Sequence, residues 1–97
     1  MSYRFHPAAE AEHYEAVQFY ESCSVGLGGD YLAEFEQVME HVVSAPHRYR
    51  IERPPNIRRA SLVRFPYKVI YREVEGDIQV LSVSHKRRRP AYWAERL

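Results

Sequence analysis

The stretch of sequence that decides the fold is Tyr67-Lys68-Val69-Ile70-Tyr71-Arg72-Glu73-Val74-Glu75-Gly76-Asp77-Ile78-Gln79-Val80-Leu81-Ser82-Val83-Ser84. It predicts two strands, residues 67–74 and 78–84, because both runs are rich in the β-branched and aromatic residues that favour strands. The three residues between them are typical of a turn. The register of this hairpin stays open, since a two-residue and a three-residue turn pair the strands differently. A three-residue turn puts on one face Val69, Tyr71, Leu81, Val83 and His85.

Two further strands are predicted outside this hairpin. Residues 57–63 lead into it, and residues 2–5 alternate, with Tyr3 and Phe5 on one side. Residues 47–56 contain three arginines and the pair Pro54-Pro55, which indicates an irregular basic connection.

Two helices are predicted between the first strand and that connection. Pro7 suits the first position of a helix, and apolar residues follow it at helical spacing up to Ser24. The glycines at 26, 28 and 29 then form a turn rather than a phosphate-binding loop, because no strand precedes them and no Lys-Ser or Lys-Thr pair follows. Asp30 is a suitable N-cap for the second helix, which ends at Pro46.

Together these elements predict one α+β domain over residues 1–97. The order is strand, helix, helix and three strands, and a chain of this length supports one core. We expect the helical hairpin to cover one face of a small antiparallel sheet, with the first strand added at the sheet's edge. The other face is then free for function.

The charge of the chain is divided between its two halves. Residues 1–45 hold eight acids and one base, whereas residues 46–97 hold thirteen Lys or Arg and five acids. The halves carry −7 and +8, which together give the net charge of +1. A division of this kind points to nucleic acid or an acidic protein as a partner.

The composition argues against several classes of site. The single Cys23 cannot form an intrachain disulfide, and neither it nor the five histidines offer a metal-binding pattern. We therefore expect no metal and no other cofactor. No apolar run is long enough to span a membrane, and the N-terminus lacks a signal-peptide pattern. We expect a cytoplasmic protein that has no membrane partner.

Basic residues gather on or beside the last three strands, where we expect one continuous positive surface. They are Arg58, Arg59, Arg64, Lys68, Arg72, Lys86, Arg87, Arg88 and Arg89. The alternative is a solvated face whose charges serve solubility. His85, at a strand end, can act as an acid or base near neutral pH. Tyr92 can stack on a nucleic-acid base, whereas Trp93 is expected to anchor the C-terminal segment on the core.

Four motifs, taken in chain order, carry a family resemblance. They are Pro7-x-Ala9 at the first helix, Ala45-Pro46 after the second, FPYKVIYR at residues 65–72 and VLSVSHKRRRP at residues 80–90. Their order and spacing resemble the RelE/ParE superfamily of toxins, the toxin halves of type II toxin–antitoxin (plasmid stabilisation) modules. The resemblance covers essentially the whole chain.

The resemblance implies two alternative mechanisms. RelE-like members are mRNA interferases that enter the ribosomal A site and cleave mRNA without metal, by attack of the ribose 2′-hydroxyl on the adjacent phosphate. ParE-like members share the fold, lack that catalytic set and poison DNA gyrase. Both are silenced by an antitoxin whose extended or helical tail wraps the toxin. A non-toxic module that binds nucleic acid or protein is a third interpretation.

From the sequence we favour the RelE-like mechanism, for which the resemblance implies a set of site residues. Lys68 stands where RelE-like toxins have a functional arginine, and Ser61 where they have a strand lysine. The implied catalytic residues are Lys68, His85, Arg87, Arg88 and Tyr92. The implied residues for binding substrate phosphates are Arg59, Arg64, Arg72 and Lys86. The partners expected are a cognate antitoxin, the ribosome with its mRNA (or gyrase in the alternative), and a second copy of the chain.

Overall fold

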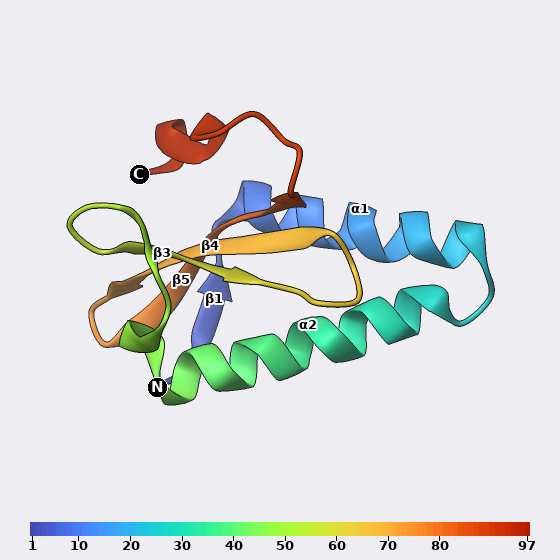
Figure 1. The fold of residues 1–97 in the computed structure, drawn as a ribbon, viewed down its shortest axis with the longest axis horizontal. Helices are drawn as coiled ribbons and strands as arrows, with labels where there is room; N and C mark the ends of the chain where they lie inside the picture. Colours follow the sequence, from blue (N-terminus) through green and yellow to red (C-terminus); the bar gives the residue numbers. More distant parts are fainter.

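The computed structural model describes residues 1–97, which form two helices and a five-stranded sheet (Figure 1). The strands are β1 (Tyr3–Phe5), β2 (Ile51–Arg53), β3 (Ile57–Ser61), β4 (Tyr67–Val74) and β5 (Asp77–His85). The helices are α1 (Pro7–Cys23) and α2 (Leu27–Ser44), with short 3₁₀ helices η1 (Pro46–Arg48) and η2 (Tyr92–Arg96). The predicted α+β class and the order of the main elements are confirmed.

The sheet has the order β1-β5-β4-β3-β2 and is mixed rather than wholly antiparallel. β1 runs parallel to β5, with Tyr3 opposite Ile78 and Phe5 opposite Val80, whereas all other pairs are antiparallel. A parallel pair needs a long connection between its strands. Here the two helices and three strands between β1 and β5 provide that connection, which the local pattern of residues 2–5 could not reveal.

The basic connection after the helices is more regular than predicted. Its residues 51–53 form β2, which pairs antiparallel with β3 through Ile51 and Arg58, and a bulge follows. The outermost strand is therefore short and irregular, which is how natural sheets keep an edge from pairing with other chains.

α1 begins and ends where the sequence predicts. The His6 side chain accepts a hydrogen bond from the Ala8 N–H at 3.1 Å, and Pro7 occupies the first turn. The helix ends at Cys23, with Ser24 as its C-cap.

α2 begins four residues earlier than predicted, so Asp30 lies in its first turn and is not its N-cap. The N-cap is Gly26, whose φ of 88° lies in the left-handed region that favours glycine. The carboxylate of Glu21, on α1, accepts hydrogen bonds from the N–H groups of Gly26 and Gly28. Because this cap comes from the other helix, the local sequence indicated Asp30 instead.

The β4–β5 hairpin closes through a two-residue turn at Glu75 and Gly76, both with positive φ. Its register shifts once: Ile70 pairs with Ser82 but Tyr71 pairs with Val80, so Leu81 is an extra residue in β5. The shift places Leu81 on the face opposite the one on which Val80 and Val83 pack. The two-residue turn and this shift together define the hairpin register, which the sequence left open.

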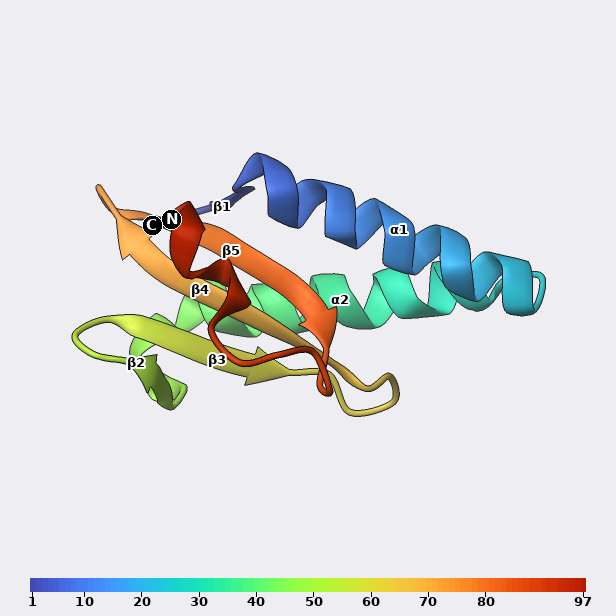
Figure 2. The same cartoon turned by 90° about the horizontal axis from the view of Figure 1, so that it is seen from above.

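Two apolar clusters stabilise the sheet, one on each face. The larger one joins the helices to the sheet and includes Tyr31, Phe35, Met39, Val42, Val69, Tyr71, Val80 and Val83. The smaller one consists of Ile57, Ile70, Leu81 and Trp93. Trp93 lies on η2, so the C-terminal segment covers part of the face that we expected to be free (Figure 2). The expected anchoring role of Trp93 is confirmed, since only 2% of its surface is exposed.

Candidate functional site

The predicted basic residues do not form one continuous surface, because several point to different faces and have separate partners. Arg58 donates hydrogen bonds to the backbone carbonyls of His47 and Tyr49. The other partnered side chains are Arg59, 3.7 Å from Glu52; Arg64, 3.3 Å from Asp30; and Arg72, which donates to Gln79 at 2.9 Å. These cations are bound within the fold and spread over both faces and the rim of the sheet.

Lys68 is buried in the face of the sheet that carries η2. It lies in register between Ser61 of β3 and Ser84 of β5, and 6% of its surface is exposed. No hydrogen bond or ion pair joins its ammonium to another residue of the chain. Lys68 is therefore a cation flanked by two hydroxyl-bearing residues and largely covered by its neighbours.

His85 lies on the opposite face from Lys68. It pairs with Tyr67, whose ring packs on the helical side beside Tyr20 and Tyr31. Because successive side chains of a strand point to opposite faces, Lys68 faces away from His85. The His85 Nδ1 accepts a hydrogen bond from the Arg87 N–H at 3.0 Å. The two residues implied as catalytic partners are thus separated by the thickness of the sheet.

The loop that follows β5 carries four consecutive exposed cations, Lys86–Arg89. Arg88 turns back over the chain, with its guanidinium carbon 3.9 Å from the centre of the Tyr92 ring, a cation–π arrangement. The side chains of Lys86, Arg87 and Arg89 have no ion pair with the rest of the chain. This loop is the main concentration of unpaired positive charge in the molecule.

The Tyr92 hydroxyl is already engaged. It donates a 2.6 Å hydrogen bond to the Glu12 carboxylate and lies 2.7 Å from the Ser82 hydroxyl. Burial, and next its hydrogen bond to Glu12, raise the pKa of Tyr92 above its usual value. A phenol bound to a carboxylate is a poor donor of a proton to a substrate, because that proton already has an acceptor.

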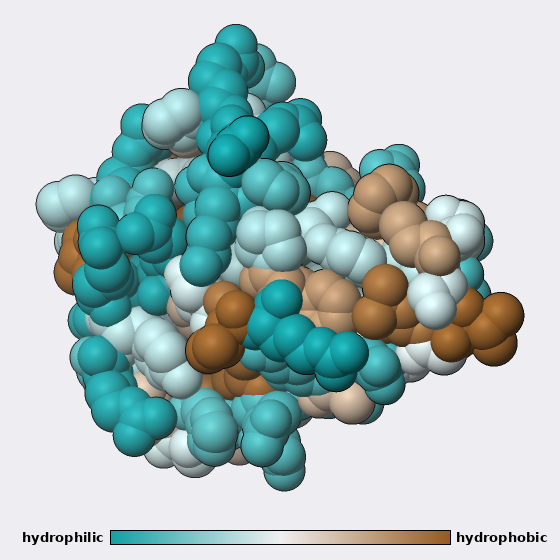
Figure 3. Space-filling view, turned by 45° about the vertical axis from the view of Figure 1, so that its right-hand side comes forward, coloured by the Kyte–Doolittle hydropathy of each residue, from teal (hydrophilic) through white to brown (hydrophobic).

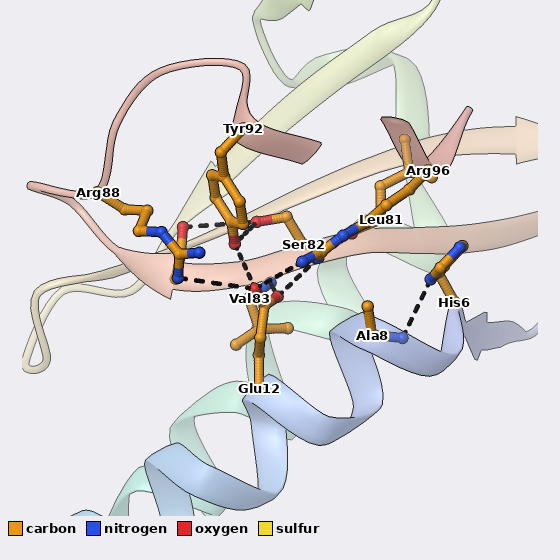
Figure 4. Close-up of polar contacts among 10 residues, drawn as sticks. His6, Ala8, Glu12, Leu81, Ser82, Val83, Arg88, Tyr92 and Arg96 are labelled. Carbon is orange, nitrogen blue, oxygen red and sulfur yellow. Dashed lines mark hydrogen bonds and ion pairs between the residues drawn. The ribbon is translucent and has the colours of Figure 1, made fainter. Parts of the chain in front are cut away.

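Glu12 is the residue that the sequence analysis missed, and it holds this part of the molecule together (Figure 4). From α1 its carboxylate accepts hydrogen bonds from the Val83 N–H at 3.0 Å and from both terminal nitrogens of Arg96 at 2.9 and 3.0 Å, in addition to Tyr92. The Arg88 guanidinium lies 4.0 Å away. We call Glu12, Val83, Tyr92 and Arg96 the Glu12 network.

The Glu12 network keeps its carboxylate ionised. Burial alone raises the pKa of Glu12, but the hydrogen bonds from Arg96, Tyr92 and Val83 together outweigh it and hold the pKa below its usual range. In the sequence, Glu12 is one of several acids within the first helix, so no local pattern distinguishes it.

Exposed apolar side chains lie around the turn between the helices and on the β3–β4 loop. Val25 is 95% exposed there, and Phe19 on α1 is also exposed. Val63, on the β3–β4 loop, is 93% exposed, and the Glu34 carboxylate fixes this loop by accepting hydrogen bonds from the Val63 and Arg64 N–H groups. Figure 3, in which the turn between the helices comes forward, shows brown apolar surface gathered there among hydrophilic residues. Contiguous exposed apolar surface is typical of protein-binding sites.

Two classes of site have no support in the arrangement of side chains. No group of three or more His, Cys, Asp or Glu side chains is placed to hold a metal ion. Neither helix combines the length and the apolar character that crossing a membrane requires.

Comparison with known proteins identifies the family. A sequence model of the ParE toxin of type II toxin–antitoxin systems, parDE, matches residues 3–90. The chain is also similar to a solved chain described as the chromosomal ParDE toxin–antitoxin system from P. aeruginosa. The TM-score is 0.70 at 19% identity, over 88% of this chain and 95% of that chain, a likeness of fold. A search of curated proteins found no match. Since the family match spans nearly all of the fold, the chain belongs to the ParE toxin family of type II toxin–antitoxin systems.

Proposed function

We propose that this toxin poisons DNA gyrase in the cytoplasm and that a cognate antitoxin neutralises it. The proposal rests on the family, whose ParE-like members share the RelE fold without its catalytic residues. It ranks the gyrase alternative above the mRNA cleavage that the sequence alone favoured.

The observation that carries this choice is the separation of His85 from Lys68. Metal-free cleavage of RNA needs an acid or base and a phosphate-binding cation on the same side of one phosphate. Here the two side chains lie on opposite faces of the sheet, and the Tyr92 hydroxyl is bound to Glu12. A set divided in this way supports a toxin that works by binding rather than by cleaving RNA.

Two features suit binding to a large protein target. The exposed Lys86–Arg89 loop supplies positive charge for an acidic or DNA-bound surface. Phe19, Val25 and Val63 supply exposed apolar contacts. We infer that the target and the antitoxin use these surfaces.

The test is to induce the toxin and to follow DNA and protein synthesis separately by pulse labelling. We expect DNA synthesis to stop first, purified gyrase to accumulate cleaved DNA when the toxin is added, and co-expression of the antitoxin encoded beside the gene to restore growth. Normal growth with soluble toxin present would contradict the toxin function itself.

Substitutions at the implied catalytic residues separate the two mechanisms. Lys68→Met keeps the buried apolar stem, and His85→Gln keeps a hydrogen-bond acceptor for the Arg87 N–H. We expect both variants to remain toxic, because neither residue takes part in a reaction. If the toxin cleaves mRNA, each variant should lose activity on the order of a hundredfold. Early arrest of protein synthesis with cut mRNA would then exclude the gyrase mechanism.

Ribosome-dependent mRNA cleavage remains a second candidate because of one observation. Lys68, Tyr92 and the base of the Lys86–Arg89 loop do share the η2 face of the sheet. In that mechanism Lys68, Arg87 and Arg88 would stabilise the phosphate, while Arg59, Arg64, Arg72 and Lys86 would position the RNA. The same two variants decide between the candidates.

A further inference from the structure

The loop between β3 and β4 is exposed at its tip and fixed at both of its ends. Leu62 and Phe65 are buried in the larger apolar cluster. Between them Val63 and Arg64 are exposed, and Val63 leaves 93% of its surface in solvent. The Leu62 N–H donates a 3.0 Å hydrogen bond to the Tyr67 carbonyl, which closes the loop. Two buried residues thus carry an exposed pair between them.

A carboxylate from α2 adds a further restraint to this loop. Glu34 accepts hydrogen bonds from the Val63 N–H at 2.7 Å and from the Arg64 N–H at 3.2 Å. The Arg64 side chain is held as well, because it lies 3.3 Å from the Asp30 carboxylate, with its guanidinium carbon 5.3 Å from the centre of the Phe65 ring. A loop that is already ordered loses little conformational freedom when it binds, so its exposed valine is suited to act as an anchor.

The Lys86–Arg89 loop adjoins the β3–β4 loop. β3 ends, β4 begins and β5 ends at the same end of the sheet, because these strands are paired antiparallel. The Lys86 N–H donates a 2.9 Å hydrogen bond to the Pro66 carbonyl, which joins the two loops. Figure 2 shows them meeting at this end of the sheet. We call Val63, Arg64 and Lys86–Arg89 together the loop surface.

The composition of the loop surface favours an acidic protein as its partner. Of the four cations in Lys86–Arg89, only Arg88 approaches a carboxylate of the chain, that of Glu12 at 4.0 Å. The other three are free to meet acidic groups of a partner. Phosphates of a nucleic acid could also meet them, but a phosphate backbone offers no apolar partner to Val63. On a protein, Val63 can enter an apolar pocket while the cations meet carboxylates at its rim.

We propose that the loop surface docks on an apolar pocket ringed by carboxylates on the protein that the toxin attacks. Val63 is the anchor of this contact, and Glu34 is the positioning residue that holds the loop in its binding conformation. Under the proposed function, on which the choice of partner rests, the protein attacked is gyrase. The contact then comes from two loops that the sheet holds together, and it needs no reacting group.

The positioning role of Glu34 is testable without any partner. Glu34→Ala removes the acceptor of two loop N–H groups, whereas Glu34→Gln keeps one oxygen for them. The informative amides are those of Tyr67 and Lys86, which donate to loop carbonyls and not to Glu34. We expect hydrogen exchange at both to become about tenfold faster in Glu34→Ala and to stay near the wild-type rate in Glu34→Gln.

The matched control for this experiment is Glu40→Ala, which removes an exposed carboxylate from the same helix. Its exchange rates should equal those of the wild type. Wild-type exchange of the Tyr67 and Lys86 amides in Glu34→Ala would overturn the positioning role. Circular dichroism of each variant verifies that the rest of the fold is intact.

The docking is tested by titrating the toxin into purified gyrase with its DNA, and into the same DNA alone. Val63→Asp should bind gyrase at least about tenfold more weakly, because it loses the burial of an apolar side chain. Glu34→Ala should bind about threefold to tenfold more weakly, because its loop has to be ordered on binding, and Glu34→Gln should restore the affinity. Tyr14→Asp, at an exposed residue of α1, is the control and should bind like the wild type. Added salt should weaken the binding of the wild type more than that of Lys86→Gln/Arg87→Gln.

Two outcomes of the titration overturn the docking surface. One is wild-type affinity of Val63→Asp for gyrase. The other is tight binding to the DNA alone that Val63→Asp leaves unchanged, because the cations would then serve a nucleic acid. If the wild type binds no gyrase, the proposed function fails instead, and growth arrest on induction tests the surface against whichever protein the toxin attacks. Loss of arrest in Val63→Asp but not in Tyr14→Asp then supports the surface, and equal arrest in both overturns it.

Discussion

At the scale of single residues, His13 has an unusual environment for an ionisable group. Its ring lies on α1 among Phe5, Tyr31 and Phe35, with ring centres 5.2, 6.0 and 4.2 Å away. Its Nδ1 is buried and has no hydrogen-bond partner. Burial lowers the pKa of His13, although Glu36 and Glu10 oppose this effect.

This environment predicts that acid destabilises the fold through His13. The unfolded chain takes up a proton at His13 near pH 6.5, whereas the folded chain resists it, so the unfolded state binds more protons below that pH. The free energy of unfolding should therefore be at its full value above pH 6.5 and fall as the pH is lowered, by at most about 1.4 kcal/mol per pH unit from this group. Urea unfolding between pH 5 and pH 8 measures it.

The comparison for this prediction is His13→Phe, which keeps an aromatic ring and removes the titrating group. Its unfolding free energy should depend less on pH over the same interval. Equal slopes for the two proteins would show that protonation of His13 contributes nothing.

At the scale of elements, the contact between the two helices depends on one glycine. A Cβ built at Gly28 lies 2.6 Å from the Val17 carbonyl oxygen and 3.0 Å from Glu21 Cβ, because α2 starts directly against α1. A Cβ at the next residue, Gly29, meets nothing within 4 Å.

These neighbouring glycines provide a matched pair of substitutions. Gly28→Ala should destabilise the protein by about 1–3 kcal/mol, because backbone atoms must move to admit the methyl group. Gly29→Ala should instead stabilise it by about 0.5–1 kcal/mol, because alanine loses less conformational freedom in a helix. Thermal unfolding of both variants checks the prediction, and a similar loss in both would mean that the close helix contact is unimportant.

The elements also show which features of the fold can be predicted from sequence. Composition and periodicity locate β4, β5 and both helices because these signals lie within each segment. The start of α2 was misplaced because its cap is a carboxylate from the preceding helix, Glu21. The hairpin register includes one extra residue, Leu81, whose apolar side chain suits either face of the sheet. In the structure it packs with Trp93, which is distant in the sequence, so the local pattern could not place it.

At the scale of the whole molecule, the C-terminal segment acts as a second layer on the sheet. Trp93 buries Ile57, Ile70 and Leu81, which come from three different strands. Tyr92 and Arg96 tie the same segment to α1 through Glu12. The Glu12 network could not be predicted from sequence, because Glu12 and Arg96 are 84 positions apart and no local pattern joins them.

This second layer should contribute a large share of the total stability. Trp93→Ala removes the central side chain of the smaller cluster and should cost about 3–5 kcal/mol, a large part of the 5–15 kcal/mol that is usual for a domain. Far-UV circular dichroism in urea measures it. Tyr14→Ala, at an exposed aromatic on α1, is the control and should change the stability by less than about 1 kcal/mol. A small loss for Trp93→Ala would mean that η2 is not part of the cooperative unit.

The parallel pairing of β1 with β5 also bears on how this protein is made. β1 is synthesised before the helices and β5 after the other four strands, yet the two strands lie side by side (Figure 1). β5 separates β1 from β4 within the sheet, so the earlier strands cannot assemble around it before it is synthesised. Contacts between such distant segments form slowly, because a long loop has to close first. The nascent chain therefore lacks its finished sheet until β5 has been synthesised.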